Sequence, residues 1–144
     1  MNRIYVPPLK KLKSMSLPQL DKLYWSLFSR WIRLKAADIR TGYIVCFICG
    51  KPVHWTNADT MHYIPRRHGA TRFNLYNNHA GCVECNRYKG GNLIKYAKRL
   101  TEVYGEGTTE RLEEMRNWTI KIDRHDYIEG ILQVNKKLEA YERT

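Results

Sequence analysis

The four cysteines place the strongest constraint on what this chain can fold into. They stand in two C-x2-C pairs, Cys46–Cys49 and Cys82–Cys85, and Gly50 follows the first pair directly. A gap of two residues lets both thiolates of a pair face one tetrahedral ion. Gly50 supplies the permissive backbone that such a turn needs. Because protein would fill all four coordination positions, that ion has no open position for substrate. The pattern predicts a structural Zn²⁺ ion bound by Cys46, Cys49, Cys82 and Cys85.

Two disulfide bonds are the alternative interpretation of these cysteines. The segment from Met1 to Lys13 is basic, but it lacks the apolar stretch and the small-residue cleavage site of a signal peptide. No run in the sequence approaches the roughly 18 apolar residues that span a bilayer. We therefore expect a soluble intracellular protein that has no membrane partner. In a reducing compartment, metal-bound thiolates are favoured over disulfides.

The positive charge of the chain lies in the same part of the sequence as the cysteines. Residues 1–45 carry nine Lys and Arg against two acids, and residues 46–91 carry six against two. Residues 92–144 carry ten of each, so the net charge of +11 arises entirely before residue 92. A one-sided basic excess is typical of proteins that bind a polyanion, most often nucleic acid. The alternative is an ordinary solvated basic surface.

The sequence before the cysteines predicts an arm and one long helix. Residues 1–15 contain two prolines and several lysines and are interpreted as an extended basic arm. Residues 16–42 show helical periodicity, with Ser16 and Gln19 forming a capping box at the start and Thr41-Gly42 ending the helix. We expect this helix to pack on the core. Residues 43–91 have the Gly, Pro and Asn content of a small metal-stapled module.

Three amphipathic stripes follow the cysteines and predict a helical extension over residues 92–144. The first runs from Leu93 to Val103, and the third is entered through a cap pair of Asp126 and Glu129. The second is expected to continue past its start at Thr108 through four apolar positions, Leu112, Met115, Trp118 and Ile122. The whole chain is expected to form one compact α+β domain.

Histidine and asparagine side chains in and after the 32-residue stretch between the cysteine pairs are the candidates for chemistry. Neutral imidazole is the side chain whose basicity lies closest to physiological pH, so His62 could activate a nucleophile. Asn86, directly after Cys85, offers an amide oxygen to a hard divalent cation. Taken one at a time, His62 would be interpreted as a satisfied polar residue and Asn77 as a turn residue.

Together these residues resemble the HNH, or His-Me finger, nucleases in their zinc-bearing form. The resemblance rests on the run His62–Pro65, on Asn77 five residues before Cys82, and on the run Cys85–Lys89. It implies a small ββα-metal core with a treble-clef-like zinc site, flanked by an N-terminal long helix and C-terminal helices. In that core His62 would be the general base, Asn77 would orient the base and its loop, and Asn86 would bind a catalytic Mg²⁺ or Mn²⁺ ion.

The chain departs from the HNH pattern at Met61, where most members carry an aspartate that binds the metal. A thioether is a poor ligand for Mg²⁺. We expect Asp59 to supply the second metal ligand from a shifted position. His68 and His79 are the rival ligands, and a histidine would favour Mn²⁺, Zn²⁺ or Ni²⁺ over Mg²⁺. His79 is otherwise expected to be a packing or hydrogen-bonding residue.

From Phe28 to Asn92 the chain is similar to the phage NinG (Rap) recombination proteins, most of all in the run His62–Phe73. This resemblance implies a nuclease that acts on branched DNA, such as Holliday junctions, in the cytoplasm of the bacterial host. A homodimer would match the two symmetric strands of a four-way junction. The side chains expected to bind the DNA backbone are Arg30, Arg33, Arg66, Arg67, His68, Arg72, Arg87 and Lys89.

Two other functions fit the same sequence. One is a non-catalytic zinc-ribbon adaptor that binds DNA and whose HNH site has decayed, as Met61 suggests. The other is an RNA-binding zinc module. The nuclease predicts that His62 matters for turnover and little for affinity. The adaptor predicts that charge and zinc matter while His62 is dispensable, and the RNA-binding module predicts a preference for RNA over DNA in direct competition.

Overall fold

The computed structural model describes residues 3–142, which combine helices with two small antiparallel sheets, so the predicted α+β class is confirmed. Two compact units make up this part of the chain. The first combines residues 3–31 with residues 122–142, and the second comprises Ile32–Lys121. All four cysteines and the candidate catalytic residues lie in the second unit. Within residues 3–142, every helix is too short or too polar to cross a membrane.

The first unit begins with a short helix, α1 (Leu9–Ser14), where the sequence predicted an extended arm. That prediction is wrong for these residues because Leu12 is completely buried, and burial stabilises the turn that carries it. The backbone amide of Leu12 donates to the carbonyl of Pro8 at 3.1 Å, which closes the first turn. Residues 1–2 of the predicted arm lie outside the described residues.

Helix α2 (Leu17–Ala36) begins as the sequence predicts and ends earlier. The amide of Ser16 donates to Oε1 of Gln19 at 2.9 Å, and the amide of Gln19 donates to Oγ of Ser16 at 3.2 Å, so the capping box is confirmed. The helix ends at Ala36 because the Asp38 carboxylate accepts hydrogen bonds from the backbone amides of Arg40 and Thr41. These bonds turn the chain away before Gly42.

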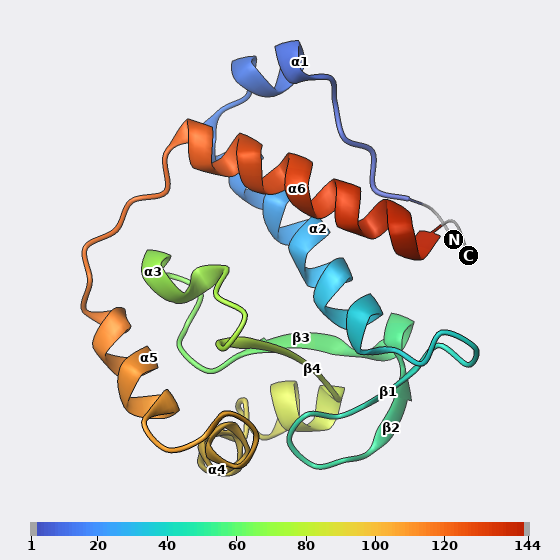
Figure 1. Cartoon of the computed structure of the whole chain (residues 1–144), viewed down its shortest axis with the longest axis vertical. Coiled ribbons are helices and arrows are strands. Elements are labelled where there is room, and N and C mark those ends of the chain that lie inside the picture. Colours follow the sequence, from blue (N-terminus) through green and yellow to red (C-terminus); the bar gives the residue numbers. More distant parts are fainter. Residues whose placement is uncertain (1–2, 143–144) are drawn as a thin grey trace. The chain divides into compact units, whose positions relative to one another are not determined.

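Helix α6 (Arg124–Glu142) lies beside α2 in the first unit (Figure 1). Gly130 permits this approach, since a Cβ there would collide with the ring of Tyr24. The sequence predicted that Asp126 would pair with Glu129 at the start of this helix, and that partner is wrong. Asp126 pairs reciprocally with Asp123, each backbone amide donating to the other's carboxylate at 2.8 and 3.1 Å, while the Glu129 carboxylate lies 3.3 Å from a ring nitrogen of His125.

The second unit is built around two antiparallel strand pairs (Figure 1). In the first pair Ile44 lies opposite Val53, and in the second His62 lies opposite Asn78. Strand β1 also contacts β4, so the two pairs are neighbours. The strands and the short helix η1 after the first pair are β1 (Tyr43–Val45), β2 (Pro52–His54), η1 (Trp55–Asn57), β3 (Asp59–His62) and β4 (Asn78–Gly81).

Helices follow both strands of the second pair. One buried core cluster packs these helices against the strands, and it includes three of the cysteines, Met61, Tyr96 and Leu100. Helix α5 contacts both α3 and α4. The helices are α3 (Gly69–Arg72), the π-helix η2 (Glu84–Tyr88), α4 (Leu93–Tyr104) and α5 (Thr108–Arg116).

The second predicted C-terminal stripe is helical only as far as Arg116. Trp118 is 43% exposed, so burial does not favour another helical turn there. Instead the backbone passes close to α3, where a Cβ on Gly69 would lie 2.5 Å from the carbonyl oxygen of Ile120. The prediction of a helix through Trp118 and Ile122 is therefore wrong.

Asn77 holds the loop that joins β3 to β4. Its Oδ1 accepts the amide of Ile64 at 2.7 Å, and its Nδ2 donates to the carbonyls of Ile64 and Thr71 at 3.1 and 3.2 Å. The side chain is completely buried. Buried amides are rarely left unsatisfied, so these three bonds fix the chain that leaves His62 relative to the strand that begins after Asn77.

Replacement of Asn77 by alanine tests this role in the fold. Asn77→Ala removes the side-chain partner of the amide and the carbonyl of Ile64, while the carbonyl of Thr71 still accepts the amide of Asn74 at 3.1 Å. We expect the free energy of unfolding to fall by about 3 kcal/mol in denaturant titration. The matched control is Asn57→Ala, at the exposed end of η1, which should change stability by no more than about 0.5 kcal/mol. Equal stability of the two variants would contradict the assignment.

Candidate functional site

The four cysteines converge on one point in the second unit. Their sulfur atoms all lie within 4.8 Å of one another, and Sγ of Cys49 is 3.7 Å from Sγ of Cys82. That separation is far longer than the roughly 2.0 Å of a disulfide bond. It agrees with the edge of a tetrahedron of zinc–sulfur bonds, which is about 3.8 Å for bonds of about 2.3 Å. Cys49 is exposed and the other three are buried. The cluster could therefore bind a zinc ion, as the spacing predicts.

Neighbouring donors favour the thiolate form of Cys46, whereas burial raises the pKa of Cys82 to about 12 and also raises the pKa of Cys85. Burial alone would raise the pKa of the Cys46 thiol, but backbone hydrogen bonds, the strongest from Cys49, bring that pKa down to about 7. The amide of Cys85 lies 3.4 Å from Sγ of Cys82, and Nδ2 of Asn92 lies 3.6 Å from Sγ of Cys85. Such hydrogen bonds orient metal-binding sulfurs.

His62 is the last residue of β3 and is half-buried. Burial lowers its pKa below the usual value for histidine, and the positive charges of Arg66 and Arg72 lower it further. The imidazole is therefore neutral at physiological pH and can accept a proton.

His62 and Asn86 line the same cavity, which has a volume of about 360 Å³. Residues 63–65, the Gly90-Gly91 turn and Leu93 form part of its wall. The remaining wall comes from Glu113 and Arg116 on α5, and the Tyr63 hydroxyl donates to Glu113 at 3.2 Å. Neither α5 residue is predicted from the sequence, because nothing in their spacing distinguishes them from an ordinary solvated helix face.

Asp59 is engaged by its neighbours and lies outside the lining of this cavity. Arg87 donates to both of its carboxylate oxygens at 2.9 Å, and Nδ2 of Asn86 donates to Oδ2 at 2.9 Å. Burial alone would raise the pKa of Asp59, but the bonds from Arg87 and Asn86 hold it below its usual value. Met61 is completely buried in the core cluster, so the position before His62 faces away from the cavity. Asp59 thus orients Asn86 in this arrangement.

His79 is a packing and hydrogen-bonding residue, as expected. Its Nδ1 lies 2.6 Å from the Tyr96 hydroxyl and its Nε2 lies 2.9 Å from the Tyr104 hydroxyl. Its ring stacks on Phe47 with centroids 3.8 Å apart. Burial, and then the charge of Lys35, lower its pKa to about 3. With both ring nitrogens engaged away from the cavity, His79 is not placed to bind a metal beside His62.

His68, the other rival ligand, is the residue before α3. Its Nε2 is buried and has no hydrogen-bond partner among residues 3–142. His68 is not part of the cavity wall that His62 and Asn86 share.

Three of the side chains expected to bind DNA make internal contacts. Arg30 forms an ion pair with Glu142 at 3.0 Å in the first unit. Arg33 donates to the carbonyl of Trp55 at 3.2 Å and lies over its ring. Arg87 is held by its two bonds to a carboxylate, as described above. These contacts limit the reach of the three side chains toward a phosphate.

Of the other cations of that set, Arg66, Arg67 and Lys89 are exposed on the second unit and Arg72 is half-buried. Arg66 and Arg67 are exposed in the loop after β3. Nη1 of Arg72 donates to the carbonyl of Arg66 at 3.3 Å. The ammonium of Lys89 lies 3.7 Å from the carboxylate of Glu84, a surface pair that contributes little to stability. Arg66 and Arg67 are thus the best placed of the predicted DNA contacts.

Part of the sequence is similar to a nuclease. Over 73 residues, about 51% of this chain, the sequence is 29% identical to the CRISPR-associated endonuclease Cas9 of Corynebacterium diphtheriae, of which the match covers 7%. No solved structure matches the chain.

The broader similarities run along most of the sequence. The chain is 32% identical over 124 residues to protein ninG of Escherichia phage lambda, covering 77% of this chain and 56% of that protein. It is 30% identical over 124 residues to protein ninG of Escherichia phage 933W, covering 77% and 57%. The chain therefore spans just over half the length of these relatives. The family model for the bacteriophage lambda NinG protein matches residues 8–144, and this chain belongs to that family.

Proposed function

We propose that this chain is a metal-dependent DNA endonuclease of the HNH type that hydrolyses phosphodiester bonds in branched recombination intermediates such as four-way junctions. One observation carries the proposal: His62 and Asn86 line one cavity, and Asn77 pins the loop between them in the fold. The similarity of half the chain to an endonuclease supports the same reaction class.

His62 acts as the general base. Because its pKa lies below that of an ordinary histidine, the neutral ring takes a proton from a water molecule as that water attacks the phosphorus. The bond from phosphorus to the 3′ oxygen then breaks, and the leaving oxygen carries away the electron pair. Arg116 lines the same cavity and supplies positive charge for the phosphate oxygens.

Asn86 and Glu113 fit a divalent cation in this cavity. The amide nitrogen of Asn86 donates to Asp59, which leaves Oδ1 as the ligand atom. Glu113 is the carboxylate on the cavity wall, and it takes the ligand role expected of Asp59, which acts instead through Asn86. A bound Mg²⁺ or Mn²⁺ ion would stabilise the developing charge on the leaving oxygen.

The cysteine cluster binds a structural zinc ion under this proposal. We expect one zinc ion per purified chain, measured by plasma mass spectrometry, and loss of that ion in Cys82→Ser. Because three of the four cysteines belong to the core cluster, zinc removal should also unfold much of the second unit, seen as lost helical circular dichroism. His62→Ala is the control and should retain full zinc. A zinc-free chain with unchanged stability would refute the structural role.

Cleavage of labelled four-way junctions and matched linear duplexes, with Mg²⁺ or Mn²⁺, tests the reaction itself. His62→Ala should lower the cleavage rate by about 10²- to 10⁴-fold while the affinity for DNA stays within about twofold. His125→Ala, an exposed histidine in the first unit, should cut as the wild type does. Glu113→Gln should raise the metal concentration needed for half-maximal cutting.

Two outcomes would redirect the assignment. If both DNA molecules are bound and neither is cut with any metal, the chain is a non-catalytic DNA-binding adaptor, the reading that Met61 favours. If RNA displaces DNA in direct competition, the chain is an RNA-binding zinc module.

A further inference from the structure

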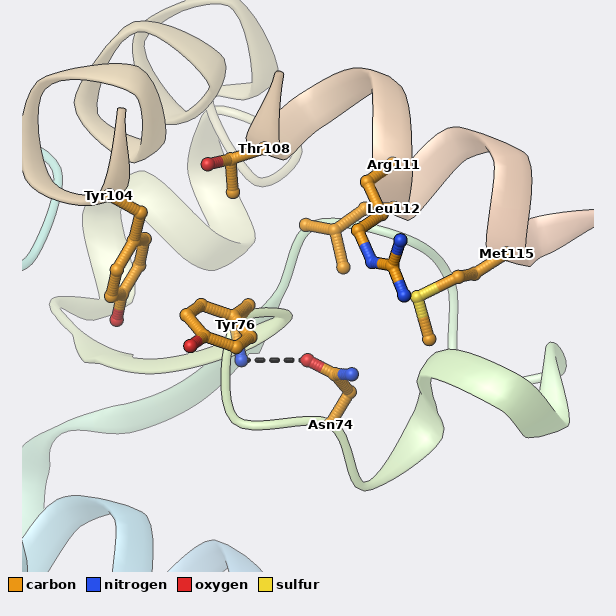
Figure 2. Close-up of a pocket in the computed structure, with 7 residues that line it drawn as sticks. All are labelled: Asn74, Tyr76, Tyr104, Thr108, Arg111, Leu112 and Met115. Carbon is orange, nitrogen blue, oxygen red and sulfur yellow. Dashed lines mark hydrogen bonds between the residues drawn. The ribbon is translucent and has the colours of Figure 1, made fainter. Parts of the chain in front are cut away.

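A second cavity, of about 400 Å³, lies between α5, the end of α4 and the turn at residues 74–76 (Figure 2). The turn at Asn74 and Tyr76 lines one side, and α4 and α5 line the other through Tyr104, Thr108 and Arg111. None of these residues belongs to the wall around His62.

Two tyrosine rings form an aromatic corner in this cavity. The rings of Tyr76 and Tyr104 are 4.9 Å apart and meet at 82°, and they are 53% and 40% exposed. The Tyr104 ring is anchored because its hydroxyl binds His79 at 2.9 Å. The Tyr76 ring packs against it, and the backbone of Tyr76 is held because its amide donates to Oδ1 of Asn74 at 2.8 Å. Anchored rings with an open face lose little freedom when a planar group stacks on them.

The rest of the cavity combines an apolar floor with a positive rim. Leu112 is 2% exposed and forms the floor. Figure 2 shows the Arg111 guanidinium directed toward the side of the cavity formed by Asn74. The Arg111 side chain makes no hydrogen bond or ion pair with any of residues 3–142. An arginine with a free planar guanidinium beside exposed aromatic rings is suited to a flat ring that carries a phosphate.

We propose that this cavity binds an unpaired base of a DNA strand, stacked on Tyr76, with the adjoining phosphate on Arg111. The inference rests on the proposed function, because it takes DNA as the ligand. A base inside a duplex is covered on both faces and cannot enter a cavity, whereas a base outside the stack can. Because α5 also contributes Glu113 and Arg116 to the cavity around His62, the same helix borders both sites.

Binding measured without added Mg²⁺ or Mn²⁺ tests this site independently of cleavage. The probes are a duplex with one unpaired 2-aminopurine and the same duplex fully paired. Wild type should prefer the unpaired probe and quench its fluorescence. Tyr76→Ala and Arg111→Gln should each weaken binding of the unpaired probe about tenfold, with little change for the paired duplex. Tyr76→Phe keeps the ring and should bind as the wild type does.

Matched controls separate the cavity from general effects of ring and charge. Tyr43→Ala removes a tyrosine that is 52% exposed on β1, and Arg40→Gln removes one charge from the turn after α2. Both should bind the unpaired probe as the wild type does. Equal affinity of wild type for the two duplexes, or equal binding by Tyr76→Ala and Tyr76→Phe, would overturn the inference.

Further results distinguish a base within a strand from a free nucleotide, and the base-binding site from the nuclease activity. Displacement of the strand by an equal concentration of free 2-aminopurine nucleotide would overturn the inference, because the cavity would then be a mononucleotide site. A preference for the unpaired probe in a protein that cuts no DNA would refute the nuclease and leave this site standing. Cutting without that preference would refute this site and leave the nuclease.

Discussion

The convergence of four cysteine sulfurs within 4.8 Å is the contact on which the second unit depends. Cys46 follows β1, and the pair at Cys82 and Cys85 follows β4, so the cluster ties the two strand pairs together. Cys46, Cys82 and Cys85 also share a buried core with Met61 and other apolar side chains. A small module of short strands buries too little apolar surface to be stable alone, so a metal at this point would supply much of its folding energy.

The chemistry that the fold supports follows from a second, smaller constraint. Asn77 binds the backbone on the far side of the loop, so the residues after His62 cannot move away from the strand pair. Asn86 follows the second cysteine pair directly, and Asp59 fixes its amide. The cavity therefore receives one residue from a strand and one from the helix beside the cysteines. Helix α5 completes it with a carboxylate and a guanidinium.

Local sequence patterns predicted the features that depend on local geometry. The capping box at Ser16 forms because it depends on residues close in the chain, and the spacing within each C-x2-C pair is local in the same way. The two pairs are separated by 33 residues from Cys49 to Cys82, and their convergence was predicted from the four ligands that a tetrahedral zinc ion needs. The contribution of Glu113 and the arrangement of Arg87 on Asp59 depend on contacts across 28 or more residues, which no periodicity reports. The same reason explains the stripe that ends at Arg116, where contact with Gly69 replaces another helical turn.

The central claim is that the cysteine cluster and the cavity of His62 and Asn86 are two separate metal sites with different chemistry. Anomalous diffraction from crystals grown with Mn²⁺, recorded at the zinc and manganese absorption edges, tests it most directly. The account predicts a zinc peak among the four sulfurs and a manganese peak beside Asn86 and Glu113. Manganese confined to the cysteines, or absent from the cavity in crystals that hold the zinc, would contradict it.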